Sequence, residues 1–279
     1  MPEGSRGAWP QAGTSQPARA TRVLIVGGLD PSGGAGVTVD ESAVRDQGCQ
    51  CELVLTARTD QDDREVRTIG ARDPHDWLEE ALASFAAGSV HALKFGLLPG
   101  REHVTHAAQL VRALRERSPE MPVIVDPVLA SSSGHEFLDA PARAALCAEL
   151  ASLGVVLTPN LPEAARLVGA GSERLAQLVT EPGARLAVAQ ELLALGARGV
   201  VLKAGHGAEQ PARELVLEPG SDPVWLEQER LPGGGIRGSG CRHASVLACG
   251  LALGEHLPTS ARRAATYVAG CIRAAATNY

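Results

Sequence analysis

The sequence predicts an α/β fold with a mostly parallel central sheet and helices on both of its faces. Short apolar runs alternate along the chain with longer segments in which apolar residues recur at helical spacing. Many of the short runs are rich in β-branched residues and end at Gly, Asp, Pro or Asn, which is typical of buried parallel strands. A β-α-β-α order requires crossover helices, and these cover a parallel sheet from both sides.

Eight apolar runs are predicted to be strands. Six of them are expected to belong to the parallel part of the sheet: Arg22–Gly27, Glu52–Thr56, Ala92–Phe95, Val123–Val125, Val155–Thr158 and Val200–Lys203. Two later runs, Glu214–Leu217 and Val224–Glu227, are expected to form an antiparallel pair.

Helices are predicted between the strands and at the end of the chain. One segment carries apolar residues on a single helical face, at Val104, Ala107, Val111 and Leu114. A later segment does the same at Leu186, Ala189 and Leu193, and Gly196 is its predicted stop signal. Two further helical stretches, Cys241–Leu253 and Thr259–Ala276, close the chain.

The domain organisation is predicted to be simple. The chain of 279 residues shows no internal repeat and no interior linker, so one domain is expected over residues 21–279. Residues 1–20 are rich in Gly, Pro, Ser, Ala and Arg and are predicted to be a disordered tail. They lack the apolar segment of a secretory signal, and no run reaches the roughly 18 apolar residues of a membrane span. We therefore expect a cytoplasmic protein.

The charge and the cysteines argue against several classes of function. The net charge is -6 and no basic block occurs, so neither nucleic acid nor an anionic membrane is expected as a partner. The six cysteines show no C-x-x-C spacing, which argues against a thiolate metal site. Only two of the 26 basic residues, Lys94 and Lys203, are lysines. A kinase can use a lysine as a compact charge that binds phosphate.

Candidate binding residues follow the first two strands, because open parallel sheets bind ligands beyond the carboxyl ends of their strands. The glycines of the loop Gly27–Gly36 permit positive φ and a close approach of the backbone to a ligand. The alternative is a flexible turn into a helix. Asp40 lies about one turn into that helix, where a surface acid would also be ordinary. The polar segment Thr56–Asp63 is expected to be a solvated loop.

Three later strand ends carry residues suited to magnesium and phosphate. Asp126 follows the fourth strand, and Asn160 and Glu163 follow the fifth, a set of oxygen ligands that suits Mg²⁺. Asn160 is alternatively a helix N-cap, with Glu163 completing a capping box, and both roles can hold together. Lys203 ends the sixth strand, where it can reach a nucleotide phosphate.

The segment Gly233–Cys241 leads directly into an apolar helix. The backbone amides at the start of a helix form an anion site, and glycines let a phosphate approach them closely. The thiolate of Cys241 is expected to be favoured by the helix end, with a pKa below the usual value of about 8.5. The alternative is a glycine hinge before a buried helix.

Seven motifs occur in order along the chain: GLDPSGGAG at 28–36, TARTDQ at 56–61, KFGLL at 94–98, DPV at 126–128, TPNLPEA at 158–164, VLKAGH at 201–206 and GSGC at 238–241. Together they resemble the hydroxymethylpyrimidine and phosphomethylpyrimidine kinases of thiamine biosynthesis, within the ribokinase superfamily. The resemblance runs from about Arg22 to the C-terminus. It implies a three-layer ribokinase-like fold and transfer of phosphate from ATP, with Mg²⁺, to an aminopyrimidine alcohol and then to its monophosphate. It also implies a homodimer.

The resemblance assigns expected roles to the substrate residues. Asp40 and Gln61 would hydrogen-bond the aminopyrimidine ring, beside Gly28 and Gly34 of the glycine-rich loop. Cys241 stands where sugar kinases have an aspartate base, which favours the pyrimidine or pyridoxal branch and makes it the candidate base.

The nucleotide residues are assigned in the same way. Lys203 would face the nucleotide, while Asn160 and Glu163 would organise Mg²⁺ and the phosphates, with Asp126 nearby. The anion hole would be built by Gly238, Ser239, Gly240 and Cys241. Independently of the resemblance, we expect Arg237 or Arg242 to add a second phosphate clamp, because an arginine can bind a phosphate through two hydrogen bonds.

The chain departs from the family pattern at four places. Asp40-Glu41-Ser42 lacks the lysine of D-L-K-T, and Pro232–Arg237 lacks the family's acid, Asn and His. Arg242 replaces a small hydroxyl residue, and Ser131–Ser133 replaces a loop that often carries a lysine. Two alternatives therefore remain open: a pyridoxal kinase of the same branch, and a former kinase that binds a pyrimidine as a sensor.

Overall fold

The computed structural model describes residues 21–61, 66–131, 134–169, 171–203, 205–231 and 235–277, with the backbone alone at 60–61 and 66–67. Within these ranges the strands form one nine-stranded sheet in the order β3-β2-β1-β4-β5-β6-β7-β8-β9. The strands are β1 Arg22–Leu29, β2 Gln50–Gln61, β3 Val66–Ala71, β4 Ala92–Phe95, β5 Val123–Val125, β6 Val156–Leu157, β7 Gly199–Leu202, β8 Ala212–Leu217 and β9 Val224–Gln228.

The pairing of the strands confirms the mostly parallel sheet. Six strands pair in parallel: β2, β1, β4, β5, β6 and β7, in their order across the sheet. Strand β3 at one edge and strands β8 and β9 at the other are antiparallel. The predicted antiparallel pair therefore exists as β8 and β9, next to the last parallel strand.

Nine α-helices lie within the described ranges: α1 Gly36–Asp46, α2 Pro74–Ala87, α3 Arg101–Arg117, α4 Ala140–Ala145, α5 Leu161–Leu167, α6 Ser172–Thr180, α7 Pro182–Ala194, α8 Ser239–Ala252 and α9 Leu257–Ala276. Helix α4 continues through a π-turn at Leu146–Leu150 and a 3₁₀ turn at Ala151–Leu153. Among the described helices, none is both long and apolar enough to cross a membrane.

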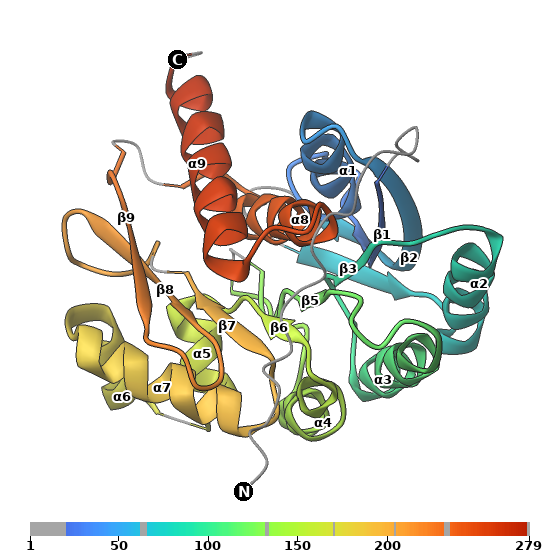
Figure 1. Ribbon diagram of the computed structural model, residues 1–279, viewed down its shortest axis with the longest axis horizontal. Helices are drawn as coiled ribbons and strands as arrows, with labels where there is room; N and C mark the ends of the chain where they lie inside the picture. The colour runs from blue at the N-terminus through green and yellow to red at the C-terminus, as the bar shows by residue number, and fades with distance from the viewer. Residues whose placement is uncertain are drawn as a thin grey trace, which may run out of the picture.

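The helices form a layer on each face of the sheet (Figure 1). Side chains of a strand alternate between the two faces. Leu24 and Val26 of β1 accordingly pack in the core that α2, α3, α5 and α7 share, whereas Val23 and Ile25 pack in the core under α1, α8 and α9. Both cores are filled mainly by Ala, Leu and Val, with Trp77 the largest side chain that is fully buried. The three-layer prediction is confirmed.

The predicted helical faces also agree with the structure. The apolar stripe of α3, from Val104 to Leu114, is buried. Helix α7 ends one residue before Leu195, and Gly196 follows it with a φ of +101°. Gly196 thus has the left-handed conformation that commonly ends a helix.

One prediction, for the segment after the second predicted strand, is wrong. Thr56–Asp63 was expected to be a solvated loop, but β2 continues to Gln61 and pairs antiparallel with β3, while residues 62–63 lie outside the described residues. Thr56 and Thr59 are buried, and the Thr56 hydroxyl donates a hydrogen bond of 2.6 Å to the Leu97 carbonyl. Backbone pairing with an edge strand satisfies the peptide groups of a polar segment, so its polarity alone did not indicate a loop.

Candidate active site

The ends of β5, β6 and β7 converge with the start of helix α8. The backbone amide of Lys203, just after β7, donates a 2.9 Å hydrogen bond to Pro159, just after β6. This contact places Lys203 beside Asn160, with which it forms a parallel bridge. Residues from strand ends that are about 40 or more positions apart in sequence are thereby brought together, as predicted for this edge of the sheet.

Lys203 forms a buried ion pair with Asp126. The Nζ to Oδ1 distance is 2.8 Å, and the Thr158 hydroxyl lies 3.3 Å from the same oxygen. Burial acts to lower the pKa of Lys203, but Asp126 and Glu163 outweigh burial and raise it. Burial likewise acts to raise the pKa of Asp126, and the nearby Lys203 ammonium holds that pKa below its usual value. Both groups are therefore charged at neutral pH.

Gly240 brings the start of helix α8 against this ion pair. A β-carbon at Gly240 would lie 3.1 Å from Lys203 Nζ and 3.7 Å from Asp126 Oδ2. Gly238 precedes the helix with a φ of +72°, and no described side chain caps the helix there. The first turn of α8 and the buried Lys203 ammonium therefore lie side by side, and both favour negative charge. This geometry supports the predicted anion site.

Asn160 and Glu163 form the capping box that the sequence offered as one reading. The Asn160 side chain accepts a 2.8 Å hydrogen bond from the Glu163 amide, and Glu163 accepts one of 2.8 Å from the Asn160 amide. The N-cap role of Asn160 is confirmed. Burial and the nearby Asp126 carboxylate raise the pKa of Glu163 to about 7.

Glu163 should make the stability of the ligand-free protein depend on pH. Its pKa is about 7 in the folded state and 4.5 ordinarily. Between these values the folded protein binds a proton that the unfolded chain does not, so stability falls as pH rises through this window. The expected loss is about 1–3 kcal/mol. Urea unfolding at pH 5 and pH 7.5 measures it, and Glu163→Gln should reduce the difference. Equal differences in both proteins would contradict the assignment.

Asp40 and Lys94 form a second buried ion pair. Lys94 Nζ lies 3.0 and 2.9 Å from the two Asp40 oxygens, and the Ser245 hydroxyl donates a 2.8 Å hydrogen bond to Oδ1. Both side chains are almost fully buried, so the reading of Asp40 as an ordinary surface acid is wrong. Burial raises the pKa of Asp40 although Lys94 opposes the shift. Both carboxylate oxygens already have protein partners, and the expected hydrogen bond from Asp40 to a pyrimidine ring stays a prediction.

Lys94 was not selected as a site residue from the sequence. Its pKa is raised, because Asp40, Cys241 and Asp126 together outweigh the opposing effect of burial. The one available signal was compositional, since Lys94 is one of only two lysines in the chain. Lys94 was overlooked because it lies inside a buried strand, β4, whose sequence resembles an ordinary apolar run.

The glycine-rich loop is organised around Asp30. The Asp30 carboxylate accepts hydrogen bonds from the Ser32 amide (3.0 Å), the Ser32 hydroxyl (2.8 Å) and the Ala35 amide (3.0 Å). Gly36 has a φ of +66° and lies so close to the Gly28 carbonyl that a β-carbon would approach it to 2.3 Å. The loop is therefore a built structure, and the reading of it as a flexible turn is not supported.

Arg237 joins this loop to the anion site. Its Nη2 lies 2.8 Å from Asp30 Oδ2, and its Nη1 donates a 3.0 Å hydrogen bond to the Ser32 hydroxyl. Arg242 in turn donates a 2.8 Å hydrogen bond to the Arg237 carbonyl. A β-carbon at Gly34 would lie 3.2 Å from the Arg237 side chain. The contact of Arg237 or Arg242 with a nucleotide stays a prediction, while their contacts with the protein are in place.

The prediction for the acidity of Cys241 is wrong. Burial is the largest influence and raises its pKa to about 11, with Asp40 and Asp126 adding to the shift. Lys94 and the Gly36 amide oppose it without reversing it. A helix N-terminus is worth only about 0.3–1 kcal/mol near the surface, which is less than the cost of ionising a buried thiol. Cys241 is therefore a neutral thiol in the ligand-free protein.

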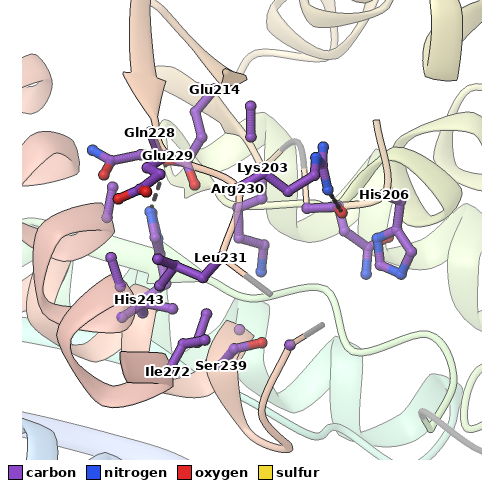
Figure 2. Close-up of a pocket in the computed structure, with 18 residues that line it drawn as sticks. Lys203, His206, Glu214, Gln228, Glu229, Arg230, Leu231, Ser239, His243 and Ile272 are labelled. Atoms are coloured by element: carbon purple, nitrogen blue, oxygen red, sulfur yellow. Dashed lines mark hydrogen bonds and ion pairs between the residues drawn. The ribbon is translucent and has the colours of Figure 1, made fainter. Parts of the chain in front are cut away.

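A cavity of about 260 Å³ opens beside the anion site (Figure 2). Lys203, Asn160, Ser239 and Gly240 line its polar end. Its apolar lining comes from Leu231 and from the α9 side chains Ala265, Val268, Ala269 and Ile272. Glu214, Gln228 and His243 also line it, although none of the three was a candidate site residue from the sequence. The cavity thus combines a cationic end with an apolar wall.

Several expected features cannot be compared with the structure. The structure does not describe the side chain of Gln61. It also does not describe Ser132–Ser133, Pro232–Gly234 or residues 1–20. Within the described residues, no group of three or more His, Cys, Asp or Glu side chains could hold a metal ion by itself.

Comparison with known proteins places this architecture among vitamin kinases. A family model described as phosphomethylpyrimidine kinase matches residues 30–278. A hydroxymethylpyrimidine/phosphomethylpyrimidine kinase of Streptomyces coelicolor is 35% identical over 254 residues, which are 90% of this chain and 88% of that protein. The protein of the same name from Rhizobium meliloti is 32% identical, over 90% of each chain.

Solved structures show the same fold. The phosphomethylpyrimidine kinase of Clostridium difficile superposes with a TM-score of 0.74 at 24% identity, over 90% of this chain and 99% of that one. A Staphylococcus aureus pyridoxal kinase, solved with AMP-PCP and pyridoxal, gives a TM-score of 0.77 at 23% identity, over 90% and 87% of the two chains. At these identities the likeness establishes the ribokinase-like fold.

Proposed function

The chain belongs to the phosphomethylpyrimidine kinase family, and from this premise we propose that it transfers the γ-phosphoryl group of ATP to the primary alcohol of hydroxymethylpyrimidine in thiamine biosynthesis. The enzyme is a phosphotransferase, as its relatives are. A second transfer, to the monophosphate, is part of the proposal, because the curated relatives carry both substrates in their names.

The observation that carries the proposal is the cavity that joins Lys203 and the start of α8 to the apolar wall of α9. Its cationic end suits the phosphates of ATP, since helix amides and a buried ammonium both favour negative charge. Its apolar end, with Val268 and Ile272, suits a purine base. One nucleotide can occupy both ends at once.

The carboxylates near the phosphate end fit a magnesium ion that arrives with the nucleotide. Asp126 and Glu163 lie close enough for each to influence the other's charge. Magnesium is commonly bound by one or two carboxylates together with substrate phosphates and water, so a larger protein cage is not needed. Glu163 would hold the ion together with Asp126 and Asn160. When bound, Mg²⁺ would neutralise charge on the phosphates.

Phosphoryl transfer depends mostly on positioning and on neutralising charge. Lys203, held by Asp126, places an ammonium beside the start of α8. The amides of Gly240 and Cys241 belong to the first turn of α8, where helix amides lack intrahelical partners, and would donate hydrogen bonds to phosphoryl oxygens as charge develops there. In the reaction the acceptor oxygen forms a bond to the γ-phosphorus, and the bond from that phosphorus to the bridging oxygen of ADP breaks. The proton of the acceptor hydroxyl passes to solvent water.

Cys241 is proposed to contribute its backbone amide and not its thiolate. With a pKa of about 11 only about one thiol in 10⁴ is ionised at pH 7. We expect Cys241→Ser to keep kcat within about threefold, because the backbone is unchanged and a general base typically contributes 10²–10⁴-fold. Steady-state kinetics from pH 6 to pH 9 measure this. A loss of 10² or more would restore the thiolate to the role of base.

The acceptor is proposed to lie between the glycine-rich loop and Cys241. Gly28, near the end of β1, and Gly34 would contribute backbone to this site, and Arg237 connects the loop to the segment before α8. Gln61 would hydrogen-bond the ring. Asp40 is proposed to act through Lys94, which it holds in the core near Cys241. A rearrangement of this ion pair on substrate binding would instead let Asp40 bind the ring directly.

A phosphorylation assay read by product mass tests the proposed function. The purified protein would be incubated with ATP and Mg²⁺ and with either hydroxymethylpyrimidine or pyridoxal. Phosphorylation of the pyrimidine with kcat/KM at least tenfold above that for pyridoxal is expected. A preference for pyridoxal would favour the pyridoxal kinase reading, and no consumption of ATP with either would favour a pyrimidine-binding sensor.

The remaining expectations form part of the same proposal. The enzyme would act in the cytoplasm, as one domain over residues 21–279 and as a homodimer. Sedimentation of the purified protein measures the last of these, with a mass near twice 28.9 kDa expected.

A further inference from the structure

Two polar side chains on the cavity wall, His243 and Glu214, are hydrogen-bonded to each other. His243 belongs to α8 and Glu214 to β8, and Figure 2 shows them pointing toward one another. The distance from Nε2 to Oε2 is 3.0 Å. The His243 side chain is 3% exposed and that of Glu214 is 14% exposed. Both residues line the cavity, so the more exposed Glu214 presents a carboxylate to it.

The histidine orients this carboxylate. A carboxylate only accepts hydrogen bonds, so Nε2 of His243 carries the proton in their contact. The other ring nitrogen, Nδ1, is buried and has no hydrogen-bond partner among the described residues. Glu214 is therefore the one hydrogen-bond partner of the ring among the described residues. The imidazole acts as a rigid support that fixes the position of Glu214.

A fixed carboxylate limits which part of a nucleotide can lie beside it. The phosphates are expected at Lys203, Ser239 and Gly240, and a carboxylate would repel them. His243 lies about one helical turn beyond Ser239 on α8, which is a rise of about 5–6 Å. The purine is expected against the apolar side chains of α9. The part of the nucleotide between phosphates and base is the ribose, whose hydroxyl groups are hydrogen-bond donors.

We propose that Glu214, held by His243, accepts hydrogen bonds from the vicinal hydroxyls of the ribose and makes the enzyme select ATP over deoxyribonucleotides. A carboxylate can recognise ribose hydroxyls in this way in nucleotide-binding sites of other folds. Glu214 is then a specificity-determining residue and His243 a positioning residue. The proposal rests on ATP being the phosphoryl donor.

Nucleotide binding, measured by calorimetry without an acceptor, tests the proposal. The ligands are the Mg²⁺ complexes of ATP, 2′-deoxyATP and 3′-deoxyATP. We expect the wild-type protein to bind ATP about tenfold more tightly than either deoxy form, as one lost hydrogen bond to a charged group predicts. Glu214→Ala should bind the three ligands equally. Glu214→Gln, which keeps size and a weaker acceptor, should retain a reduced preference.

Two further variants separate positioning from folding. His243→Leu should lose most of the preference and raise the KM for ATP while kcat at saturating ATP stays within about threefold, and His243→Gln, which keeps an N–H donor, should restore the preference. Glu227→Gln is the matched control, since Glu227 lies on β9 outside the cavity lining. Equal binding of ATP and both deoxy forms by the wild-type protein would overturn this inference alone. A wild-type protein that binds none of the three would overturn the proposed function with it.

Discussion

Lys203→Met is expected to lower kcat by about 10²–10³-fold. The Lys203 ammonium is buried at the polar end of the cavity and faces the space beside Gly240. Removing one preorganised donor from a site that stabilises developing negative charge typically costs this much. Steady-state rates with saturating ATP and hydroxymethylpyrimidine measure the effect. Lys203→Arg should not rescue it, because a planar guanidinium cannot replace a compact ammonium in so close a contact with Gly240.

A control must separate this loss from unfolding. Lys203→Met leaves Asp126 as a buried charge without its ammonium partner, so some loss of stability is also expected. Thermal melts show whether the variant is folded at the assay temperature. The double variant with Asp126→Asn should regain stability but not activity. A folded Lys203→Met protein with kcat within threefold of wild type would remove Lys203 from the proposed mechanism.

Lys94→Met is expected to destabilise the protein by about 3–5 kcal/mol. Lys94 and Asp40 are almost fully buried, so neither charge is exposed to solvent. Loss of the lysine leaves Asp40 with the Ser245 hydroxyl as its remaining side-chain partner. Removing one partner of a buried pair costs more than removing both, because the remaining charge has lost its compensation. Urea unfolding gives the free energy directly.

The double variant Lys94→Met/Asp40→Asn makes this prediction specific. It should recover much of the lost stability, since neither charge remains buried. Arg273→Met is the matched control, because the Arg273–Glu229 pair is exposed and should contribute less than about 1 kcal/mol. If the double variant were as unstable as the single one, the loss would come from packing and not from an unpaired charge.

Local features of the candidate site were predictable from the sequence. The capping box of Asn160 and Glu163 depends on residues three apart, and the structure has it as expected. Asp126 follows β5 and Lys203 follows β7, and their position at the same edge of the sheet follows from a general property of parallel sheets. The start of α8 at Gly238–Cys241 likewise follows from a glycine turn before an apolar run.

Features that depend on distant residues were not predictable in the same way. Asp40 resembled a surface acid because nothing near it in sequence shows that Lys94, 54 positions later, lies against it. The extension of β2 through polar residues depends on pairing with β3. The contact of Arg237 with Asp30 joins residues more than 200 positions apart.

The sequence therefore predicted the glycine turns, the ends of the strands and the starts of the helices, because each of these depends on residues that are close together along the chain. The order of the residues established the fold and the family, and it predicts an anion site at the start of α8. The charge states in the site were decided by packing alone. Cys241 is the clearest case, because a helix start favours its thiolate but burial beside Asp40 and Asp126 raises its pKa to about 11. Desolvation depends on everything that surrounds a group in space, and only the folded chain brings those surroundings together.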